Sequence, residues 1–383
     1  AAATDVDGFL RQLEMVHPEP FHGITREEFV AELEAYKEAL ADLTPEQSLV
    51  EFMRITALLS ANGRDGHQFA IPYANEEGPI LPIMVYEFDD GLAVTAGRGE
   101  AEALVGRRLE SIGGHPIDEV LDLVEPLVPR DGPATLRAFR PVFFLRTDVL
   151  VGLGVIERGP VELVAAGQEP VMVEPISFDE FVAWGGFTTL PSRDDLLYRQ
   201  ARPGNFWVEP VTVGGVSVLY ARYAQVQSPE GAEVSELVEL GADPEYEAVV
   251  LDLRHNGGGN NFTYPPLLEA VQQISAERPG VLRVLTDRVT FSAASNLATE
   301  IEQTTDAVFV GEPMGGGLNF WNDVQFYPMP HLPIPMRVGI STIYWEKSTP
   351  DDQRLTIEPE IAVPSLAADY FEGRDPVLEA AAG

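Results

Sequence analysis

The sequence predicts a multi-part α/β protein in which a helical region and a β-rich middle precede an α/β core. Helix-start signals open amphipathic runs before residue 60, turn signals separate short apolar runs from 68 to 175, and strands alternate with helices after 215. We expect five segments along the chain: a helical region 1–62, a β-rich segment 63–190, a connecting seam 191–214, an α/β core 215–365 and a tail 366–383.

The chain is strongly acidic, with 61 acidic against 25 basic residues and a net charge of −36. Such a charge repels phosphate backbones and anionic lipid surfaces, which disfavours nucleic acid as a partner. No apolar run reaches the roughly 18 residues that a membrane-spanning helix needs, so we expect no membrane insertion. The pattern says nothing about the oligomeric state.

Two absences limit the chemistry. The chain has no cysteine, which excludes disulfides, thiolate catalysis and cysteine-ligated zinc, and no motif calls for a cofactor. Lysine occurs only at positions 37 and 347. The start Ala-Ala-Ala-Thr-Asp is typical of a mature end left by signal cleavage, which favours an extracellular or periplasmic location. An arbitrary start explains it equally well, so a cytoplasmic location stays open.

The helical signals in the first 60 residues are capping boxes. Thr25-Arg-Glu-Glu28 and Thr44-Pro-Glu-Gln47 each place an acceptor three residues after a threonine. The second helix ends in the polar turn 62–66, directly ahead of His67. In the β-rich part, Asp89-Asp-Gly91 joins two apolar runs and predicts a hairpin.

A glycine turn follows a buried strand of the core, in Asp252-Leu-Arg-His-Asn-Gly-Gly-Gly-Asn260. Glycines at the carboxyl end of a strand let backbone N–H groups approach a ligand, so Gly258 and Gly259 are candidates for stabilising an oxyanion. The alternative is a flexible turn. A nucleotide-phosphate site is disfavoured because neither Lys-Ser/Thr nor G-x-G-x-x-G accompanies the glycines.

Ser292 falls at the start of the next helical run, in Thr290-Phe-Ser-Ala-Ala-Ser-Asn296. A serine at this place is commonly a helix cap. It is also a candidate nucleophile, because the positive helix end stabilises negative charge and the Ala293 N–H can donate to an oxyanion. Successive crossover units would bring the glycine turn and this serine to one sheet edge, which favours the nucleophile.

A serine nucleophile needs a group that accepts its proton. His67, in Arg64-Asp-Gly-His-Gln68, lies in a polar turn beside a carboxylate, although an exposed loop histidine is the simpler interpretation. His255 adjoins the glycine turn, whereas His17 and His22 bracket a Pro-Glu-Pro stretch and are interpreted as structural. No histidine and carboxylate spacing typical of a metal site occurs, so we expect none.

Taken together, these motifs resemble the tail-specific or C-terminal processing serine peptidases, with a closer likeness to the tricorn-like branch. The matching stretches are 250–259, 290–294, Val308-Phe-Val-Gly-Glu-Pro313, Ile357-Glu-Pro-Glu-Ile-Ala-Val363 and Asp65-Gly-His67. The match covers about 215–365 and, more loosely, 15–130. The resemblance implies a crotonase/ClpP-like layered core and a PDZ-like module at about 75–130, which includes the similar stretch 104–120. It also implies a peptide or protein substrate.

The resemblance also assigns roles, namely Ser292 as the nucleophile, with Ala293 and either Gly258 or Gly259 as oxyanion-hole donors. The chain departs from the family in two places. The processing peptidases carry a lysine about 25 residues after the serine, but residues 314–320 contain none. This moves the base to His67, as in the tricorn-like branch, where a serine precedes the histidine instead of Gly66. Asp352 could supply the acidic partner, with Asp351 and Asp65 as competitors.

Three functional hypotheses follow. The first is a serine hydrolase, most simply a peptidase acting on peptides or protein C-termini through Ser292 and His67. The second is a catalytically inert peptide-binding homologue, which the missing lysine and Gly66 favour. The third is a crotonase-type acyl-CoA enzyme, which shares the layered core but would need a basic patch for CoA phosphates that this acidic chain does not offer.

Overall fold

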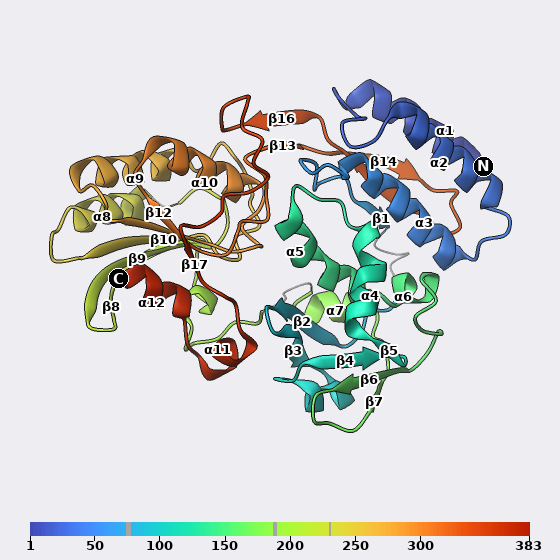
Figure 1. Cartoon of the computed structure of the whole chain (residues 1–383), viewed down its shortest axis with the longest axis horizontal. Helices are drawn as coiled ribbons and strands as arrows, with labels where there is room; N and C mark the ends of the chain where they lie inside the picture. Colours follow the sequence, from blue (N-terminus) through green and yellow to red (C-terminus); the bar gives the residue numbers. More distant parts are fainter. Residues whose placement is uncertain (74–77, 187–189, 230) are drawn as a thin grey trace. The chain divides into compact units, whose positions relative to one another are not determined.

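The chain forms two compact units, which Figure 1 draws together with their element labels. A computed structural model describes residues 1–73, 78–186, 190–229 and 231–383. The first unit comprises Ala1–Pro191 and Trp321–Tyr344, and the second comprises Ser192–Phe320 and Trp345–Gly383. Residues 321–344, which the sequence assigned to the core, therefore belong to the first unit.

Three helices begin the first unit: α1 (Ala2–Val16), α2 (Arg26–Ala39) and α3 (Pro45–Ala57). Both predicted capping boxes are present, because the hydroxyl oxygens of Thr25 and Thr44 accept the N–H three residues on. The helices bury aromatic side chains in one shared core, among them Phe9, Phe29 and Phe52. The helical character of the first 60 residues is thus confirmed.

The returning segment 321–344 completes this helical part. Strand β1 (Ala70–Pro72) pairs antiparallel with β15 (Met336–Ile340), which pairs antiparallel with β14 (Gln325–Met329). Figure 1 shows β14, in orange, beside the blue helix α1. Alternate residues of β15 pack into the core of α1–α3. Alternation of apolar and polar residues predicts a half-buried strand but does not indicate which sheet the strand joins. For this reason the sequence analysis assigned residues 321–344 to the core of the other unit.

The β-rich part has its own core. The predicted hairpin is formed by β2 (Ile83–Phe88) and β3 (Gly91–Gly97). A separate four-stranded sheet has the order β5 (His115–Pro116), β4 (Leu109–Ile112), β6 (Val161–Ala165) and β7 (Val171–Val173). Helix α4 (Ile117–Val124) packs on this core, which extends to residue 181, well beyond the expected module at 75–130. Residues 75–77 of that module lie outside the described residues.

Helices also occur where the sequence indicated only short strands. They are α5 (Pro133–Phe144) and α6 (Thr147–Gly152), followed later by α7 (Phe178–Trp184). Helix α5 has Pro133 in its first turn, and the hydroxyl of Thr135 accepts the N–H groups of Asp131 and Gly132. These start signals are weaker than a threonine cap, because Gly132 offers no side chain.

The second unit is built on a six-stranded sheet with the order β17-β12-β11-β10-β9-β8. Its members are β8 (Phe206–Val213), β9 (Val216–Tyr223), β10 (Ala248–Asp252), β11 (Leu282–Thr286), β12 (Val308–Gly311) and β17 (Ile361–Ala362). All neighbours are parallel except β8 and β9. The alternation of strands and helices, and the mostly parallel sheet, are therefore as predicted. The expected seam 191–214 instead supplies the edge strand β8.

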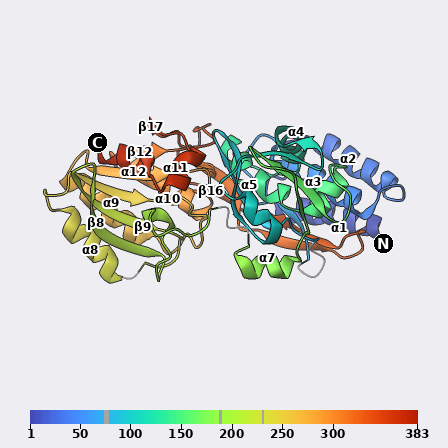
Figure 2. The same cartoon turned by 90° about the horizontal axis from the view of Figure 1, so that it is seen from below.

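Helices cover both faces of this sheet (Figure 2). Helices α8 (Gly231–Gly241), α9 (Pro265–Glu277) and α10 (Ala293–Thr304) pack on one face. On the other face, α12 (Pro376–Ala382) buries Leu378 and Ala381, and α11 (Ala367–Glu372) precedes it. The expected tail is thus packed structure. Two further strands, β13 (Asn319–Asn322) and β16 (Ile343–Glu346), pair with each other.

This topology positions the two motifs of the core. Strands β10 and β11 are parallel neighbours, so their carboxyl ends lie at the same sheet edge. The glycine turn follows β10, and residues 287–292, which we call the serine turn, follow β11. In open α/β sheets, sites form at the carboxyl ends of the strands. The two loops are therefore side by side where a site is expected.

Candidate active site

Ser292 occupies a tight turn between β11 and α10. Its backbone has φ 56° and ψ −126°, a conformation that residues other than glycine rarely adopt. Its side chain makes no capping hydrogen bond to α10, so the helix-cap interpretation does not account for this serine. A residue held in such a conformation costs about 1–3 kcal/mol, and such residues concentrate at active sites.

The second serine of the stretch has a different environment. Ser295 is fully buried in the first turn of α10, and its hydroxyl donates to the carbonyl oxygen of Thr290 at 3.1 Å. A Cβ atom on Gly316 would lie 2.1 Å from the Ser295 hydroxyl oxygen. Ser295 therefore holds the serine turn against the chain at residue 316, in keeping with its interpretation as a helix residue.

The glycine turn packs directly on Ser292. Gly258 has φ 97°, and a Cβ atom there would lie 2.6 Å from the Cβ of Ser292 and 2.8 Å from the nitrogen of Ala293. No side chain fits at this position, and an L-residue would be strained by the backbone in any case. The structure thus brings together Gly258, Ser292 and Ala293, which the sequence had grouped from separate motifs.

The glycine turn is held in shape by Asn256, which the sequence analysis did not single out. Asn256 is fully buried, and its side-chain NH2 donates to the Tyr223 carbonyl oxygen at 2.8 Å. Its side-chain oxygen accepts the Gly258 N–H at 3.0 Å, and its carbonyl oxygen accepts the Phe291 N–H at 3.0 Å. An asparagine directly before a glycine run is typical of such turns, and this was the available signal.

The bond from Gly258 to Asn256 distinguishes between the two candidate glycines. The Gly258 N–H is already donated to a side chain. The next residue, Gly259, forms an isolated parallel bridge with Val226. The hydrogen bonds of this bridge use the carbonyl oxygen of Gly258 and the N–H of Asn260, and not the N–H of Gly259. Gly258 therefore supplies close approach to Ser292, and its N–H is already used.

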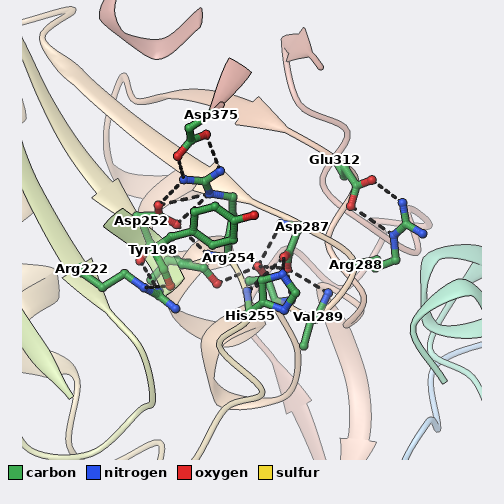
Figure 3. A network of polar contacts seen from close by, with 12 residues as sticks. Tyr198, Arg222, Asp252, Arg254, His255, Asp287, Arg288, Val289, Glu312 and Asp375 are labelled. Atoms are coloured by element: carbon green, nitrogen blue, oxygen red, sulfur yellow. Dashed lines mark hydrogen bonds and ion pairs between the residues drawn. The ribbon is translucent and has the colours of Figure 1, made fainter. Parts of the chain in front are cut away.

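His255 lies beside the glycine turn, but its ring is engaged elsewhere. Figure 3 shows it against Asp287, with the His255 Nε2 3.2 Å from a carboxylate oxygen of Asp287. Its backbone has φ 54°, and its ring stacks on Tyr198 at 5.8 Å between centroids. Burial, together with nearby arginines, holds the pKa of His255 well below its usual value, so the ring is neutral.

A buried ion network lies next to this loop (Figure 3). Arg254 donates to Asp252 and, through both terminal nitrogens at 2.8 Å, to Asp375 at the start of α12. Tyr220 also donates to Asp252, at 2.7 Å. Burial acts to raise the pKa of Asp252, but Arg254 and Arg222 hold it below its usual value. The network therefore stays ionised and fixes the end of β10 to the C-terminal helix.

Lys347, the lysine of the second unit, is not placed to form a dyad with Ser292. Lys347 lies 3.1 Å from Glu300, which is eight residues along α10 from Ser292, or about 12 Å at the helical rise. Lys37 lies in α2 of the other unit and binds Asp7 and Glu34, each at 2.7 Å. The absence of a lysine in 314–320 is thus not compensated from elsewhere in the second unit.

His67 lies in the first unit, in the turn that precedes β1. Burial lowers its pKa to about 4, and the charge of Asp65 acts in the opposite direction. The imidazole is therefore neutral at pH 7, which is the state that a general base requires. Asp65 is the one acidic candidate in the same unit as His67.

The carboxylate of Asp65 is fully buried and holds several elements together. It accepts bonds from His17 Nε2 at 3.0 Å, from the Ser341 hydroxyl at 2.7 Å and from the Gln68 amide. Burial acts to raise the pKa of Asp65, but the hydrogen bonds from His17, His22 and Ser341 hold it below its usual value. Asp65 is thus ionised and fixes the turn that carries His67.

Gly66, the residue that departs from the tricorn-like pattern, has a packing reason in this chain. Its N–H donates to a carboxylate oxygen of Asp131 at 2.6 Å. A Cβ atom on Gly66 would lie 3.1–3.2 Å from atoms of Asp131, tighter than ordinary contact. A serine here would require Asp131 to move, so the turn is held by an aspartate from outside it instead.

His17, His22 and Asp65 are the described residues that come nearest to a metal centre, with one ligand atom each within 4.8 Å of one another. The Glu19 N–H donates to His17 Nδ1 at 3.0 Å, so Nε2 carries the proton that His17 shares with Asp65. A metal ion would require His17 to move that proton and lose the Glu19 bond. The group is therefore organised as a hydrogen-bonded cluster.

The other acidic candidates lie in the second unit. Asp352 binds Arg354 at 2.8 Å and accepts the Ser348 hydroxyl at 2.6 Å, and Arg354 in turn binds Glu302. The bond from Arg354 is the main cause that lowers the pKa of Asp352. Glu302 is ten residues along α10 from Ser292, about 15 Å. Asp352 is thus engaged with Arg354 and Ser348, and Asp351 is exposed.

Comparisons with known proteins agree with this architecture. No protein-family model and no curated protein sequence matches the chain, but solved structures do. The structure of mature CPAF complexed with lactacystin matches with a TM-score of 0.62 and 14% identity over 99% of this chain and 97% of that one. A CPAF mutant matches with a TM-score of 0.63 and 14% identity over 97% and 94%. The photosystem II D1 C-terminal processing protease matches with a TM-score of 0.45 and 14% identity over 95% and 93%.

These structural neighbours are serine-type peptidases. The chain has the mixed α/β fold of CPAF over nearly its whole length, which confirms the predicted fold class. The resemblance to tail-specific and C-terminal processing peptidases, first drawn from sequence motifs, is likewise supported at the level of the fold. Across the described residues, no helix has the length and apolar character required to cross a membrane.

Proposed function

We propose that the chain is a serine hydrolase, and specifically a peptidase, with Ser292 as its nucleophile. The observation that carries this proposal is the strained conformation of Ser292, with φ 56°, packed on the side-chain-free face of Gly258. A cap does not need this conformation, whereas a nucleophile presented at a sharp strand-to-helix turn does. The fold shared with serine-type peptidases supports the same class.

The reaction would proceed by acyl transfer. The Ser292 hydroxyl oxygen attacks the carbonyl carbon of the scissile bond while its proton passes to His67, the proposed general base. The carbonyl oxygen becomes an oxyanion, which the N–H groups of Ala293 and Gly259 stabilise. His67 returns the proton to the leaving amine, and water then hydrolyses the acyl-enzyme by the same steps. Each proton removed is returned, so the cycle needs no cofactor.

The choice of His67 as the base rests on two arguments. The histidine and the lysine of the second unit are both engaged elsewhere, because Lys347 lies 3.1 Å from Glu300 and His255 Nε2 lies 3.2 Å from Asp287. His67 is neutral at pH 7 and lies in a turn fixed by Asp65 and Asp131. We further propose Asp65, rather than Asp352 or Asp351, as its acidic partner, because the charge of Asp65 acts on His67 directly.

Labelling with a fluorophosphonate tests the proposal, because this probe reacts with activated serines. We expect stoichiometric labelling of the native chain at Ser292 and none in Ser292→Ala or His67→Ala. His331→Ala serves as the control, since His331 is an exposed histidine that pairs with Asp5. A native chain that folds but is not labelled would favour the inert peptide-binding alternative. Labelling that survives His67→Ala would move the base to another residue.

Substrate class needs a separate experiment. We propose a peptide or protein substrate, which the fold shared with serine-type peptidases supports. Incubation with a peptide library that has free C-termini, and with the same library amidated at the C-terminus, would give cleavage products by mass spectrometry. Equal cleavage of both would argue against recognition of a C-terminus. Retention of CoA by the purified chain would instead favour the acyl-CoA alternative.

A further inference from the structure

Asp287 stands at the junction of the two loops that carry the proposed site. It directly follows β11 and is 5% exposed. One of its carboxylate oxygens accepts the N–H groups of Val289 at 2.9 Å and Thr290 at 3.0 Å, both in the serine turn. The same carboxylate accepts the N–H of His255 at 3.0–3.1 Å, from the loop that leads into the glycine turn. One side chain thus bonds to the backbones of both loops.

The bonded groups lie very near the reacting ones. Thr290 is two residues before Ser292, and His255 directly precedes Asn256, whose side chain holds the Gly258 N–H. Figure 3 shows Asp287 between His255 and Val289. A second direct link joins the loops, because Phe291 donates its N–H to the Asn256 carbonyl oxygen. A third link is the Thr290 hydroxyl, which donates to the Leu253 carbonyl oxygen at 2.9 Å. Asp287 is thus the side chain that bonds to backbone N–H groups of both loops, beside these two bonds.

The acceptor at this position needs to be a carboxylate. Three backbone N–H groups and the His255 ring converge on two oxygens. Burial raises the pKa of Asp287 from its usual value, while the N–H groups of His255 and Val289 and the charge of Arg254 act against this rise. In its ionised form the carboxylate offers about four acceptor sites and no donor, whereas an amide offers one acceptor oxygen and two donors that would face other N–H groups. Hydrogen bonds from N–H groups to a carboxylate are also stronger than those to a neutral oxygen.

We infer that Asp287 is a positioning residue for the oxyanion hole: its carboxylate holds the glycine turn and the serine turn at the separation that lets Gly259 and Ala293 donate to one oxyanion. The inference rests on the proposed function for its catalytic consequence. Its structural part, the coupling of the two loops, stands independently. Because its carboxylate is bonded to backbone N–H groups of both loops, Asp287 would act through the positions of these loops.

The chain offers a matched control in the next ion pair. Arg288 adjoins Asp287, and its guanidinium binds the buried carboxylate of Glu312. Replacing Glu312 with glutamine removes a carboxylate charge that is about as buried as that of Asp287 and lies at the same sheet edge. It leaves in place the Asp287 carboxylate, which accepts the N–H groups of His255, Val289 and Thr290. A purely structural role would make the two variants behave alike.

The first experiment compares Asp287→Asn with Glu312→Gln in the full chain. We expect Asp287→Asn to slow fluorophosphonate labelling by about 100-fold, the effect typical of a lost oxyanion donor. With an activated ester, kcat should fall by a similar factor while KM changes less than about threefold. Glu312→Gln should keep both rates within about threefold, even where thermal unfolding shows comparable destabilisation. Equal rates in the two folded variants would overturn the inference.

The second experiment does not depend on catalysis. Hydrogen–deuterium exchange of peptides covering 254–261 and 287–296 reports on both loops. Asp287→Asn should raise exchange in both peptides together, and Glu312→Gln in neither. Faster exchange in only one loop would overturn the coupling, even if the native chain proves unreactive and the proposed function fails. If Asp287→Asn does not fold, Asp287→Glu replaces it, because it keeps the charge but shifts the carboxylate by one methylene.

Discussion

A Cβ atom on Gly258 would lie 2.6 Å from the Cβ of Ser292, so the glycine turn and the serine turn fit only because position 258 has no side chain. This contact joins two motifs that lie 34 residues apart in the sequence. It also explains how a serine with a positive φ is kept in place, since the glycine turn closes the space into which the serine turn would relax.

Gly258→Ala should therefore abolish function while a neighbouring change does not. We expect the added methyl group to push Ser292 and Ala293 out of position, to reduce labelling by at least 100-fold and to cost about 1–3 kcal/mol of unfolding free energy. Gly257→Ala is the control, because no atom lies within 4 Å of the Cβ it would gain. Chemical denaturation and labelling rates measure both. Similar labelling of the two variants would contradict the proposed packing.

The two serines of the stretch should separate by function. Ser295→Ala removes a buried hydrogen bond to the Thr290 carbonyl oxygen and should cost about 1 kcal/mol, with labelling kept within about threefold. Ser292→Ala should remove labelling entirely and change the unfolding free energy by less than about 0.5 kcal/mol, since its side chain makes no cap. Complete loss of labelling in Ser295→Ala would reverse the assignment.

Lys347 should be dispensable for catalysis. It pairs with Glu300 on a partly exposed part of α10, an interaction worth about 0–1 kcal/mol. Lys347→Met should therefore leave the labelling rate within about threefold of the native value, in contrast to His67→Ala. A loss of labelling as large as that of Ser292→Ala would restore a Ser/Lys mechanism and remove the need for His67.

The pH dependence of kcat/KM should reflect a histidine with a lowered pKa. Since the pKa of His67 is about 4, its neutral form predominates above pH 4 and its protonated form below. Activity should thus be lost as the pH falls through about 4, not through 6.5, the usual value of an exposed histidine. The free energy of unfolding should also fall as the pH falls from 6.5 to 4, because in this range the unfolded chain binds the proton of His67 more readily than the folded chain does. Hydrolysis rates of a neutral ester substrate from pH 3.5 to 8 would measure the loss of kcat/KM on the acidic side of the profile. An inflection near pH 6.5 would contradict the burial of His67.

The three acidic candidates can be ranked by matched amide variants. Asp65→Asn should lower kcat by at least tenfold, because the turn and charge that support His67 are lost. Asp352→Asn should change it by less than about threefold, since Asp352 is engaged with Arg354 and Ser348. Asp351→Asn is the third arm, and a fall in kcat confined to that variant would transfer the role to Asp351. Thermal unfolding of each variant separates loss of catalysis from loss of fold.

Local patterns in the sequence predicted much of this protein. The capping boxes at Thr25 and Thr44 fixed the starts of α2 and α3, and the apolar run from Ala248 became a fully buried strand. The alternation of strands and helices predicted the parallel sheet, and hence that the glycine turn and Ser292 would share an edge. These features depend on residues within a few positions of one another, which is why one sequence suffices to find them.

Other assignments depended on partners distant in the chain. Strands β14 and β15 joined the core of the first unit, and α12 anchored Arg254 through Asp375, although both segments had been placed elsewhere. That the Gly258 N–H is bonded to the side chain of Asn256 likewise became visible only in the structure.

The sequence by itself thus determined the fold class, the candidate serine and the lack of a lysine in residues 314–320, because periodicity, turn residues and composition are local or countable. Tertiary structure decided what Ser292, Gly258, Asp287 and Asp65 contact. Those contacts set backbone strain, burial and pKa, and each arises from atoms that only folding brings within a few ångströms of one another.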